Sequence, residues 1–198
     1  MNHLSFKNLS FLDADPTPDK VEWKGAVLFL ACETHVFIIK RSELMPSHAG
    51  QIAFFGGNRR SDEKTPTETA CREFVEESGL SLNDIKVHGV LTTVWTARGQ
   101  IVVPVLAEWK KDADSFFKEV KSNGEWDQCF AVPWSILTDE NRWDYAQRIV
   151  TQNTPVLFFP FKSVEVSGSH PSLHSHLLWG ATARMIWDFL RLYFNTKS

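Results

Sequence analysis

The segment at residues 56–80 places the tightest constraint on how this chain of 198 residues can fold. It begins with two glycines, continues through an acidic loop and ends in a sequence with clear helix signals. Thr65 and Glu68 have the spacing of a capping box, and Pro66 suits the first helical position between them. Gly79 suits the left-handed residue that follows a last helical turn. These signals predict a helix that begins at Pro66 and ends just before Gly79.

The predicted helix carries three acidic residues on one face. Side chains three and four positions apart lie on the same side of a helix, so Glu73, Glu76 and Glu77 bring their carboxylates together. Arg72 lies four residues after Glu68 and is expected to pair with it, which leaves the three acids without a counter-charge. Mg²⁺ or Mn²⁺ would supply one, since both ions take carboxylate oxygens and keep water ligands for a phosphate-bearing substrate. Taken alone, the pattern is equally typical of a solvated acidic helix face.

The same segment resembles the Nudix box, whose usual form is Gly-x5-Glu-x7-Arg-Glu-U-x-Glu-Glu-x-Gly-U, with U a bulky aliphatic residue. The matching residues are Gly57, Glu63, Arg72, Glu73, Glu76, Glu77, Gly79 and Leu80. The chain departs from this form in two ways: the gap between Glu63 and Arg72 is one residue longer, and Phe74 stands at an aliphatic position. The longer gap is similar to that of the coenzyme A pyrophosphatase branch of the family.

The resemblance implies an α/β fold, the Nudix-type α/β/α sandwich with a mixed parallel and antiparallel sheet. Hydrophobic periodicity along the chain agrees with a mixed sheet covered on both faces. It predicts strands over 25–32, 35–41, 51–55, 86–96, 100–108, 127–132 and 156–161, helices over 66–78, 115–122 and 177–194, and a helical turn over 133–138. We expect a single Nudix hydrolase domain over 21–198, preceded by an N-terminal extension, residues 1–20, with a helix-like stretch and a turn-rich linker.

Composition and cysteine spacing exclude several classes of protein. A net charge of −3 with 43% hydrophobic residues is typical of a globular protein and not of a nucleic-acid binder, so a phosphate site must be local. Three widely spaced cysteines indicate neither a disulfide framework nor a zinc site. The sequence shows no signal-peptide pattern and no apolar run of the ~20 residues that span a bilayer, which predicts a cytoplasmic protein without a membrane partner. Exposed members of the 8 Trp and 15 Phe residues would be compatible with a homodimer.

The segment at residues 41–57 resembles the sequence that marks coenzyme A pyrophosphatases. The matching residues are Arg41, Ser42, His48, Gly50, Gln51, Ile52, Phe54, Gly56 and Gly57. The departures are Ile39 for threonine, Pro46 for a basic residue and Phe55 for proline. Residues 94–105 and 178–184 also resemble that branch, although the second of these segments equally suits a tight helix start with small residues packed under a tryptophan.

The resemblance implies a role for each matching residue. Glu76 and Glu77 are the expected principal metal ligands, with Glu73 as a third ligand or the general base. Arg72 is expected to clamp the glutamates, and Gly57 to lie at the metal and the phosphate. The glycine pair lets the backbone bend tightly.

Five other residues are candidates, some of them with alternatives left open. Arg41, His48 and Gly56 are expected to contact substrate, although His48 equally suits a hydrogen-bonded loop histidine. Glu63 and Glu125 are candidate additional acids, and both also suit solvated positions, in a loop and at the start of a strand.

The function implied is a metal-dependent hydrolase of a small nucleotide-containing substrate. Cleavage of the pyrophosphate of coenzyme A or its derivatives would give adenosine 3′,5′-bisphosphate and 4′-phosphopantetheine. One alternative is a Nudix pyrophosphatase for ADP-ribose, nucleotide sugars or other nucleoside diphosphate derivatives, favoured by the lost basic residue at Pro46. Another is a non-catalytic nucleotide-binding module, which would require a damaged box, whereas the box glutamates and Arg72 are all present.

Overall fold

The computed structural model describes residues 3–7, 9, 12, 22–96, 99–146, 156–168 and 175–194. Within these residues nine strands form one sheet: β1 (Gly25–Ala31), β2 (His35–Arg41), β3 (Ile52–Ala53), β4 (Phe55–Asn58), β5 (Ile85–Val90), β6 (Val94–Trp95), β7 (Ile101–Trp109), β8 (Trp126–Pro133) and β11 (Ser167–Gly168). The central order is β11-β8-β2-β1-β7-β5. β1 and β7 pair in parallel, and the other strand pairs described in this sheet are antiparallel.

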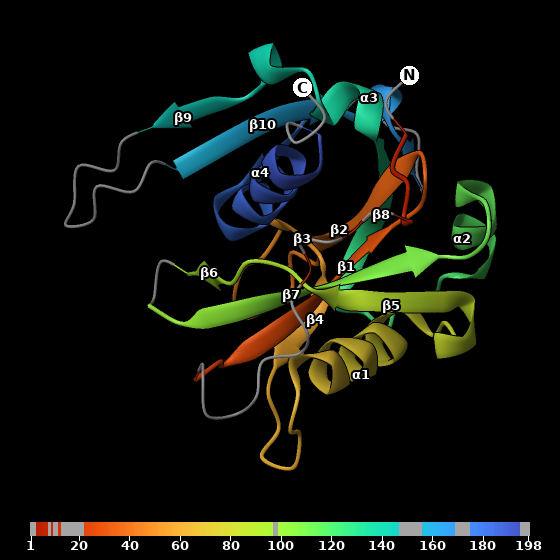
Figure 1. Ribbon diagram of the computed structural model, residues 1–198, viewed down its shortest axis with the longest axis vertical. Helices are drawn as coiled ribbons and strands as arrows, with labels where there is room; N and C mark the ends of the chain where they lie inside the picture. The colour runs from red at the N-terminus through yellow and green to blue at the C-terminus, as the bar shows by residue number, and fades with distance from the viewer. Residues whose placement is uncertain are drawn as a thin grey trace.

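A smaller sheet and the helices cover the main sheet. The small sheet has the order β12-β10-β9, with β9 (Asp144–Ala146), β10 (Val156–Lys162) and β12 (Ser175–Trp179). The helices are α1 (Pro66–Ser78), α2 (Ala113–Glu119), α3 (Trp134–Leu137) and α4 (Gly180–Tyr193), with 3-10 turns η1 (Leu82–Asp84), η2 (Glu140–Arg142) and η3 (Ser163–Glu165). Figure 1 shows α1 on one side of the main sheet and α4 with the small sheet on the other.

Side chains alternate between two cores along the central strands. Leu28 of β1 belongs to the cluster that Phe74 of α1 and Phe116 of α2 complete. Its neighbour Phe29 belongs to the opposite cluster, which includes Phe189 of α4. This alternation is what a sheet buried on both faces requires. The predicted α/β sandwich with a mixed sheet is therefore confirmed.

The helix that carries the acidic residues forms over the predicted residues. Thr65 accepts a hydrogen bond from the backbone N–H of Glu68, whose side chain accepts in return from the Thr65 N–H. Gly79 closes the helix with φ of 67°. Pro66 stands at the first position. Local sequence therefore fixes where the helix begins and ends.

The C-terminal helix is shorter than predicted, and its first part is a strand. Residues 175–179 form β12, which pairs with β10 from Ser175 beside Lys162 to Trp179 beside Phe158. Helix α4 begins only at Gly180, whose φ of 65° is easy for glycine and costly for other residues. Strand pairing with a distant segment thus overrides the local helical pattern.

Smaller differences concern element boundaries. The strand predicted over 86–96 is two strands, β5 and β6, which both pair with β7. The strand over 51–55 is divided at Phe54 between β3 and β4. The helix over 115–122 runs instead as α2, because Asp112 caps it by accepting from the Ser115 N–H. The strands β9 and β11 were not predicted.

Part of the predicted N-terminal extension packs on the domain. Leu4 is buried in the core beneath α4, and its N–H donates to the Glu33 carbonyl at 2.8 Å. Ser5 exchanges hydrogen bonds with the hydroxyl of Tyr193. Most of the predicted linker lies outside the described residues. Among the described helices, none combines the length and hydropathy needed to cross a bilayer.

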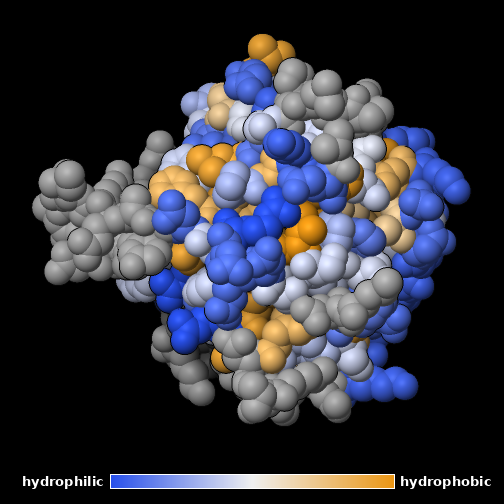
Figure 2. All heavy atoms as spheres, turned by 90° about the horizontal axis from the view of Figure 1, so that it is seen from above, coloured by the Kyte–Doolittle hydropathy of each residue, from blue (hydrophilic) through white to orange (hydrophobic). Residues whose placement is uncertain are grey.

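Apolar side chains on the face above β10 and α4 are dispersed. Figure 2 shows them there in small patches, separated by hydrophilic residues. The exposed large hydrophobic residues of the described chain come from separate elements, for example Leu44, Trp95 and Trp179. Scattered exposed apolar residues of this kind are ordinary for a folded protein and indicate no particular partner.

Candidate active site

Gly56 and Gly57 of β4 allow the sheet and α1 to lie close together. A side chain at Gly56, where φ is 155°, would place its Cβ 2.5 Å from the carbonyl oxygen of Ala26. A Cβ at Gly57 would overlap the carboxylate of Glu73. The predicted tight bend is therefore present, and the close neighbour of Gly57 is a carboxylate of α1.

Glu77 is the buried member of the acidic face, with 1% of its side chain exposed. Its Oε2 accepts the Gly56 N–H at 2.9 Å, and its carbonyl accepts the indole N–H of Trp126 at 2.8 Å. Burial raises the pKa of Glu77 to about 8; the Gly56 hydrogen bond opposes this rise, while the nearby carboxylates of Glu73 and Glu125 add to it. Glu77 is thus a carboxylate that lacks a sufficient counter-charge.

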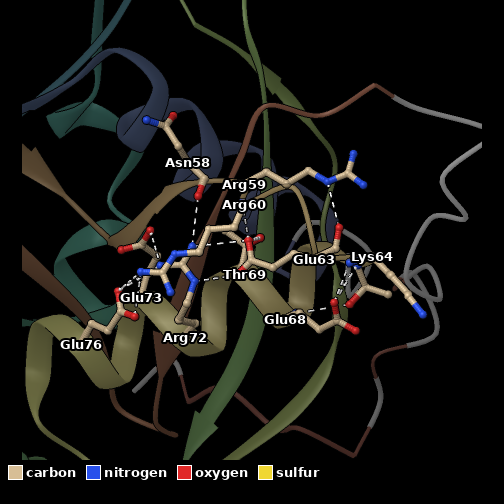
Figure 3. A network of polar contacts seen from close by, with 11 residues as sticks. Asn58, Arg59, Arg60, Glu63, Lys64, Glu68, Thr69, Arg72, Glu73 and Glu76 are labelled. Atoms are coloured by element: carbon tan, nitrogen blue, oxygen red, sulfur yellow. Dashed lines mark hydrogen bonds and ion pairs between the residues drawn. The ribbon is translucent and has the colours of Figure 1, made fainter.

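Arg72 joins the other carboxylates into one network, drawn in Figure 3. Its Nε donates to Glu63 Oε1 at 2.6 Å, and its Nη1 lies 2.8 Å from Glu73 Oε1. The same Nη1 donates to Glu76 Oε2 at 3.0 Å, and Nη2 donates to the Asn58 carbonyl. Arg72 is the predicted clamp, and the carboxylates hold its pKa above its ordinary value, Glu63 most of all.

The predicted pair between Arg72 and Glu68 is wrong. Glu68 accepts instead from the backbone N–H groups of Lys64 and Thr65 at the helix start. The capping box uses the Glu68 carboxylate at the N-terminal end, while Arg72 turns toward the loop before the helix. The backbone donors at the cap are therefore preferred over an exposed pair four residues apart, which would contribute only ~0.2–0.5 kcal/mol.

Glu63 is buried and fully engaged, so it is not a solvated loop acid. Its Oε2 accepts hydrogen bonds from Thr69 Oγ1 at 2.5 Å and from the Arg60 N–H at 2.7 Å. These add to the contact of Glu63 with Arg72. Burial alone would raise the pKa of Glu63, but the hydrogen bonds from Arg72, Thr69 and Arg60 lower it to about 2. Glu63 therefore holds the loop and Arg72 in place as a permanent anion.

Arg60 contacts the acidic face, and sequence reasoning missed it. Its Nη2 lies 3.0 and 3.1 Å from the two carboxylate oxygens of Glu76, whose side chain is 41% exposed. The only signal in the sequence is the basic pair at residues 59–60, which follows the glycine pair after Asn58. Nothing in local spacing shows that a loop residue reaches sixteen positions along the chain to Glu76.

Two residues distant in sequence complete the surroundings of Glu77. The Arg41 guanidinium lies 3.9 Å from Glu77 Oε1 through Nη1 and 3.9 Å from Glu125 Oε2 through Nη2. Backbone pairing places them together, since the Ser42 N–H donates to the Glu125 carbonyl at 2.8 Å. Both predicted candidates therefore lie at the acidic cluster. In the described part of the chain, Arg41 Nε is buried without a hydrogen-bond partner.

The structure does not bring His48 to this cluster. His48 is exposed, has a φ of 56°, and pairs through Nδ1 with Gln51 Oε1 at 3.0 Å. This agrees with the alternative of a hydrogen-bonded loop histidine. A role for His48 in substrate binding stays a prediction.

The carboxylates fit a hard divalent cation in chemistry. In the described residues, no three histidine, cysteine or acidic side chains converge as a ready-made metal cage. Arginines occupy oxygens of Glu73 and Glu76, whereas Glu77 is buried beside like charges with a raised pKa. A cation would remove the cost of ionising Glu77, and oxygen donors are those that Mg²⁺ and Mn²⁺ prefer. The assignments of Glu73, Glu76, Glu77 and Gly57 to the metal stay predictions.

Comparison with known proteins gives a family. The family model of the NUDIX domain matches residues 23–149. Nudix hydrolase 15, mitochondrial, from Arabidopsis thaliana is 24% identical over 85% of this chain and 58% of its own length. An uncharacterized Nudix hydrolase, NudL, from Photorhabdus laumondii is 28% identical over 91% of this chain and 92% of its own.

A third relative is named for its substrate. The human mitochondrial coenzyme A diphosphatase NUDT8 is 31% identical over 61% of this chain and 52% of its own length. The chain thus spans little more than half the length of this relative and of the Arabidopsis one.

Proposed function

Because the chain belongs to the Nudix family, whose domain spans residues 23–149, we propose that it hydrolyses the pyrophosphate of coenzyme A or its derivatives. The observation that carries this proposal is the position of Arg41, the arginine of the segment that resembles coenzyme A pyrophosphatases. It is 15% exposed, adjoins Glu77 and Glu125 at 3.9 Å, and its Nε has no hydrogen-bond partner among the described residues. The similarity to a protein named as a coenzyme A diphosphatase supports the same substrate.

Glu73, Glu76 and Glu77 would hold the divalent cation. When bound, such a cation neutralises phosphate charge and lowers the pKa of a coordinated water. The chain's own residues prepare the site: the Gly56 N–H orients Glu77, and Arg72 holds Glu73 and Glu76. Arg41 supplies a donor for a phosphate oxygen, which a guanidinium binds well.

Hydrolysis requires one water and one proton acceptor. The water oxygen forms a bond to one phosphorus while the bond from that phosphorus to the bridging oxygen breaks. A carboxylate of the cluster takes the water proton. Glu125 is one candidate for this base, and Glu73 is the other if it does not hold the cation. The products are two phosphate monoesters, which for coenzyme A are adenosine 3′,5′-bisphosphate and 4′-phosphopantetheine.

A second candidate substrate class is ADP-ribose and nucleotide sugars. Proline at position 46 favours it, because a guanidinium or ammonium at that position would bind coenzyme phosphate and proline cannot. The same acidic cluster would serve both substrate classes, since the reaction at the pyrophosphate is the same.

A substrate panel tests the proposal. The protein is incubated with Mg²⁺ or Mn²⁺ and coenzyme A, ADP-ribose, dinucleoside polyphosphates or deoxynucleoside triphosphates, and products are identified by mass spectrometry. We expect the highest kcat/KM for coenzyme A and loss of turnover in chelator. The substitution Glu77→Gln should lose this turnover. Glu140→Gln, which removes one negative charge from an exposed residue of η2, is its matched control and should keep it. Turnover of another substrate without turnover of coenzyme A would refute the assignment.

A further inference from the structure

An open groove lies beside the catalytic helix, at the edge where β1 begins and β4 ends. Its volume is ≈ 410 Å³, and it is lined by Glu22, Trp23, Lys24, Arg59, Arg60 and Ser61. The two chain segments meet there through the Arg59 N–H, which donates to the Lys24 carbonyl at 2.9 Å. None of these residues was a candidate in the sequence, and the reaction at the pyrophosphate uses none of them.

The groove carries more positive than negative charge. Lys24 pairs with Glu22 at 2.7 Å, and Arg60 pairs with Glu76. Arg59 forms no ion pair within 4 Å in the described part of the chain, although Lys24 first and then Arg59 lower the pKa of the Glu22 carboxyl. Its guanidinium lies 4.6 Å from the centre of the Trp23 ring, and its Nε donates to the Glu63 carbonyl at 3.0 Å. Figure 3 shows its two terminal nitrogens without a contact among the residues drawn.

These two contacts hold Arg59 ready for an anion. The guanidinium lies within cation–π distance of the Trp23 ring, which is 1% exposed, and the hydrogen bond that Nε donates to the Glu63 carbonyl also holds it. Less side-chain entropy is then lost when the free nitrogens bind a ligand. A planar fork with two free N–H groups matches a phosphate group bidentately.

The groove adjoins the reaction centre. Arg60 lines the groove and also contacts Glu76, and Gly57, which lies against Glu73, is two residues before Arg59. A substrate whose pyrophosphate lies at the acidic face can therefore extend a second phosphate-bearing part into the groove. Coenzyme A carries such a part, the 3′-phosphate on its ribose, whereas ADP-ribose does not.

We propose that the groove between Lys24, Arg59 and Arg60 binds a phosphate monoester, the 3′-phosphate of the coenzyme A substrate. The proposal rests on the proposed function. It makes Arg59 a specificity-determining residue: a substrate without the 3′-phosphate leaves the guanidinium in water and forfeits its charge-assisted hydrogen bonds. Such bonds are worth about 1.5–3 kcal/mol, or roughly 10–100-fold in binding.

Comparison of coenzyme A with 3′-dephospho-coenzyme A tests this assignment. We expect kcat/KM for coenzyme A to exceed that for the dephospho form by about 10-fold or more. Arg59→Ala should bring this ratio toward one, Arg59→Lys should restore part of it, and Lys24→Ala should lower it less. Arg191→Ala, at an exposed arginine of α4 across the sheet, is the matched control and should leave the ratio unchanged. Equal turnover of the two compounds by the parent protein would overturn the proposal while the proposed function stands.

A binding measurement keeps the two proposals separable. Adenosine 3′,5′-bisphosphate and AMP are titrated by calorimetry into the parent, Arg59→Ala and Lys24→Ala proteins, with melting curves to check folding. We expect the bisphosphate to bind the parent at least about 10-fold more tightly than AMP, and the preference to disappear in Arg59→Ala. This preference without turnover of coenzyme A would support the groove and refute the proposed function. Equal binding of the two nucleotides, or a preference that Arg59→Ala retains, would refute the groove.

Discussion

At Glu77 the requirements of folding oppose those of the proposed metal site. Its neighbours on the helix have arginine partners close by: Glu73 lies 2.8 Å from Arg72, and Glu76 contacts both Arg72 and Arg60. Glu77 has only the Gly56 N–H and an arginine nitrogen 3.9 Å away. Burying an anion with so little compensation costs free energy unless a cation joins it.

The metal-free protein should therefore be more stable with glutamine at position 77. The folded-state pKa of about 8 lies above the ordinary 4.5, so the folded chain binds more protons between these values and the free energy of unfolding falls as pH rises through that window. Glutamine resembles the protonated acid and can still accept the Gly56 N–H. At pH 8 in chelator we expect Glu77→Gln to melt at a higher temperature than the parent, with a free energy of unfolding larger by about 1 kcal/mol or more, and to lose this advantage near pH 5.

The same substitution should lower turnover and weaken the stabilisation of the protein by Mn²⁺. If Glu77 is the direct ligand that we propose, its loss should reduce turnover by more than the 10–100-fold typical of an outer-shell residue. In the parent, Mn²⁺ should raise the melting temperature at pH 8, and in Glu77→Gln it should do so much less. A lower melting temperature for the metal-free variant at pH 8 would show that Glu77 is not a strained anion.

At the scale of elements, two adjacent glycines of β4 that face different neighbours should respond differently to substitution: one should affect activity and the other stability. A methyl group at Gly57 would meet the end of the Glu73 side chain, which can rotate away. A methyl group at Gly56 would meet the backbone of Ala26 and Val27, which cannot move cheaply because β1 is central in the sheet. The same one-carbon change thus acts on a carboxylate at one position and on the fold at the other.

Gly57→Ala should fold almost normally and lose activity, whereas Gly56→Ala should lose stability. For Gly57→Ala we expect an unfolding free energy within about 1 kcal/mol of the parent, and weaker Mn²⁺ binding by calorimetry because Glu73 is displaced. For Gly56→Ala we expect a loss of about 1–3 kcal/mol from overpacking. Denaturant unfolding of both proteins distinguishes these effects. A large stability loss at Gly57 with unchanged metal binding would contradict the placement of Glu73.

Sequence alone predicted the elements whose signals are local. The capping box at Thr65 and the left-handed Gly79 placed α1, and helical spacing placed its three acids on one face. The bounds of α4 depend on the pairing of β12 with β10, a contact between segments that local periodicity does not encode. The ion-pair partners of the acidic residues could not be predicted for the same reason. Arg72 pairs with Glu63 and not with Glu68. Three further partners of the helix, Arg60, Arg41 and Trp126, come from other parts of the chain.

At the scale of the whole molecule, the two ends of the described chain are joined on one side of the sheet. The Ser5 N–H donates to the Tyr193 hydroxyl at 2.6 Å, across 188 positions of sequence. Phe6 stacks on His88 with ring centres 4.9 Å apart, and His88 pairs with Glu108 of β7. Leu4 inserts into the core that α4 covers. The N-terminal segment therefore links α4 to the main sheet and is part of the folded unit.

Leu4→Ala should consequently destabilise the entire domain and not merely loosen a terminus. Leu4 is 1% exposed, and truncation of a buried leucine to alanine costs about 2–5 kcal/mol through lost burial and the cavity left behind. Because the N-terminal segment is tied to both α4 and the sheet, we expect one cooperative transition at lower denaturant concentration with an unchanged slope. Lys7→Ala, at an exposed neighbouring position, should change the midpoint by less than about 0.5 kcal/mol. A Leu4→Ala protein as stable as Lys7→Ala would mean that the segment does not pack on the domain in solution.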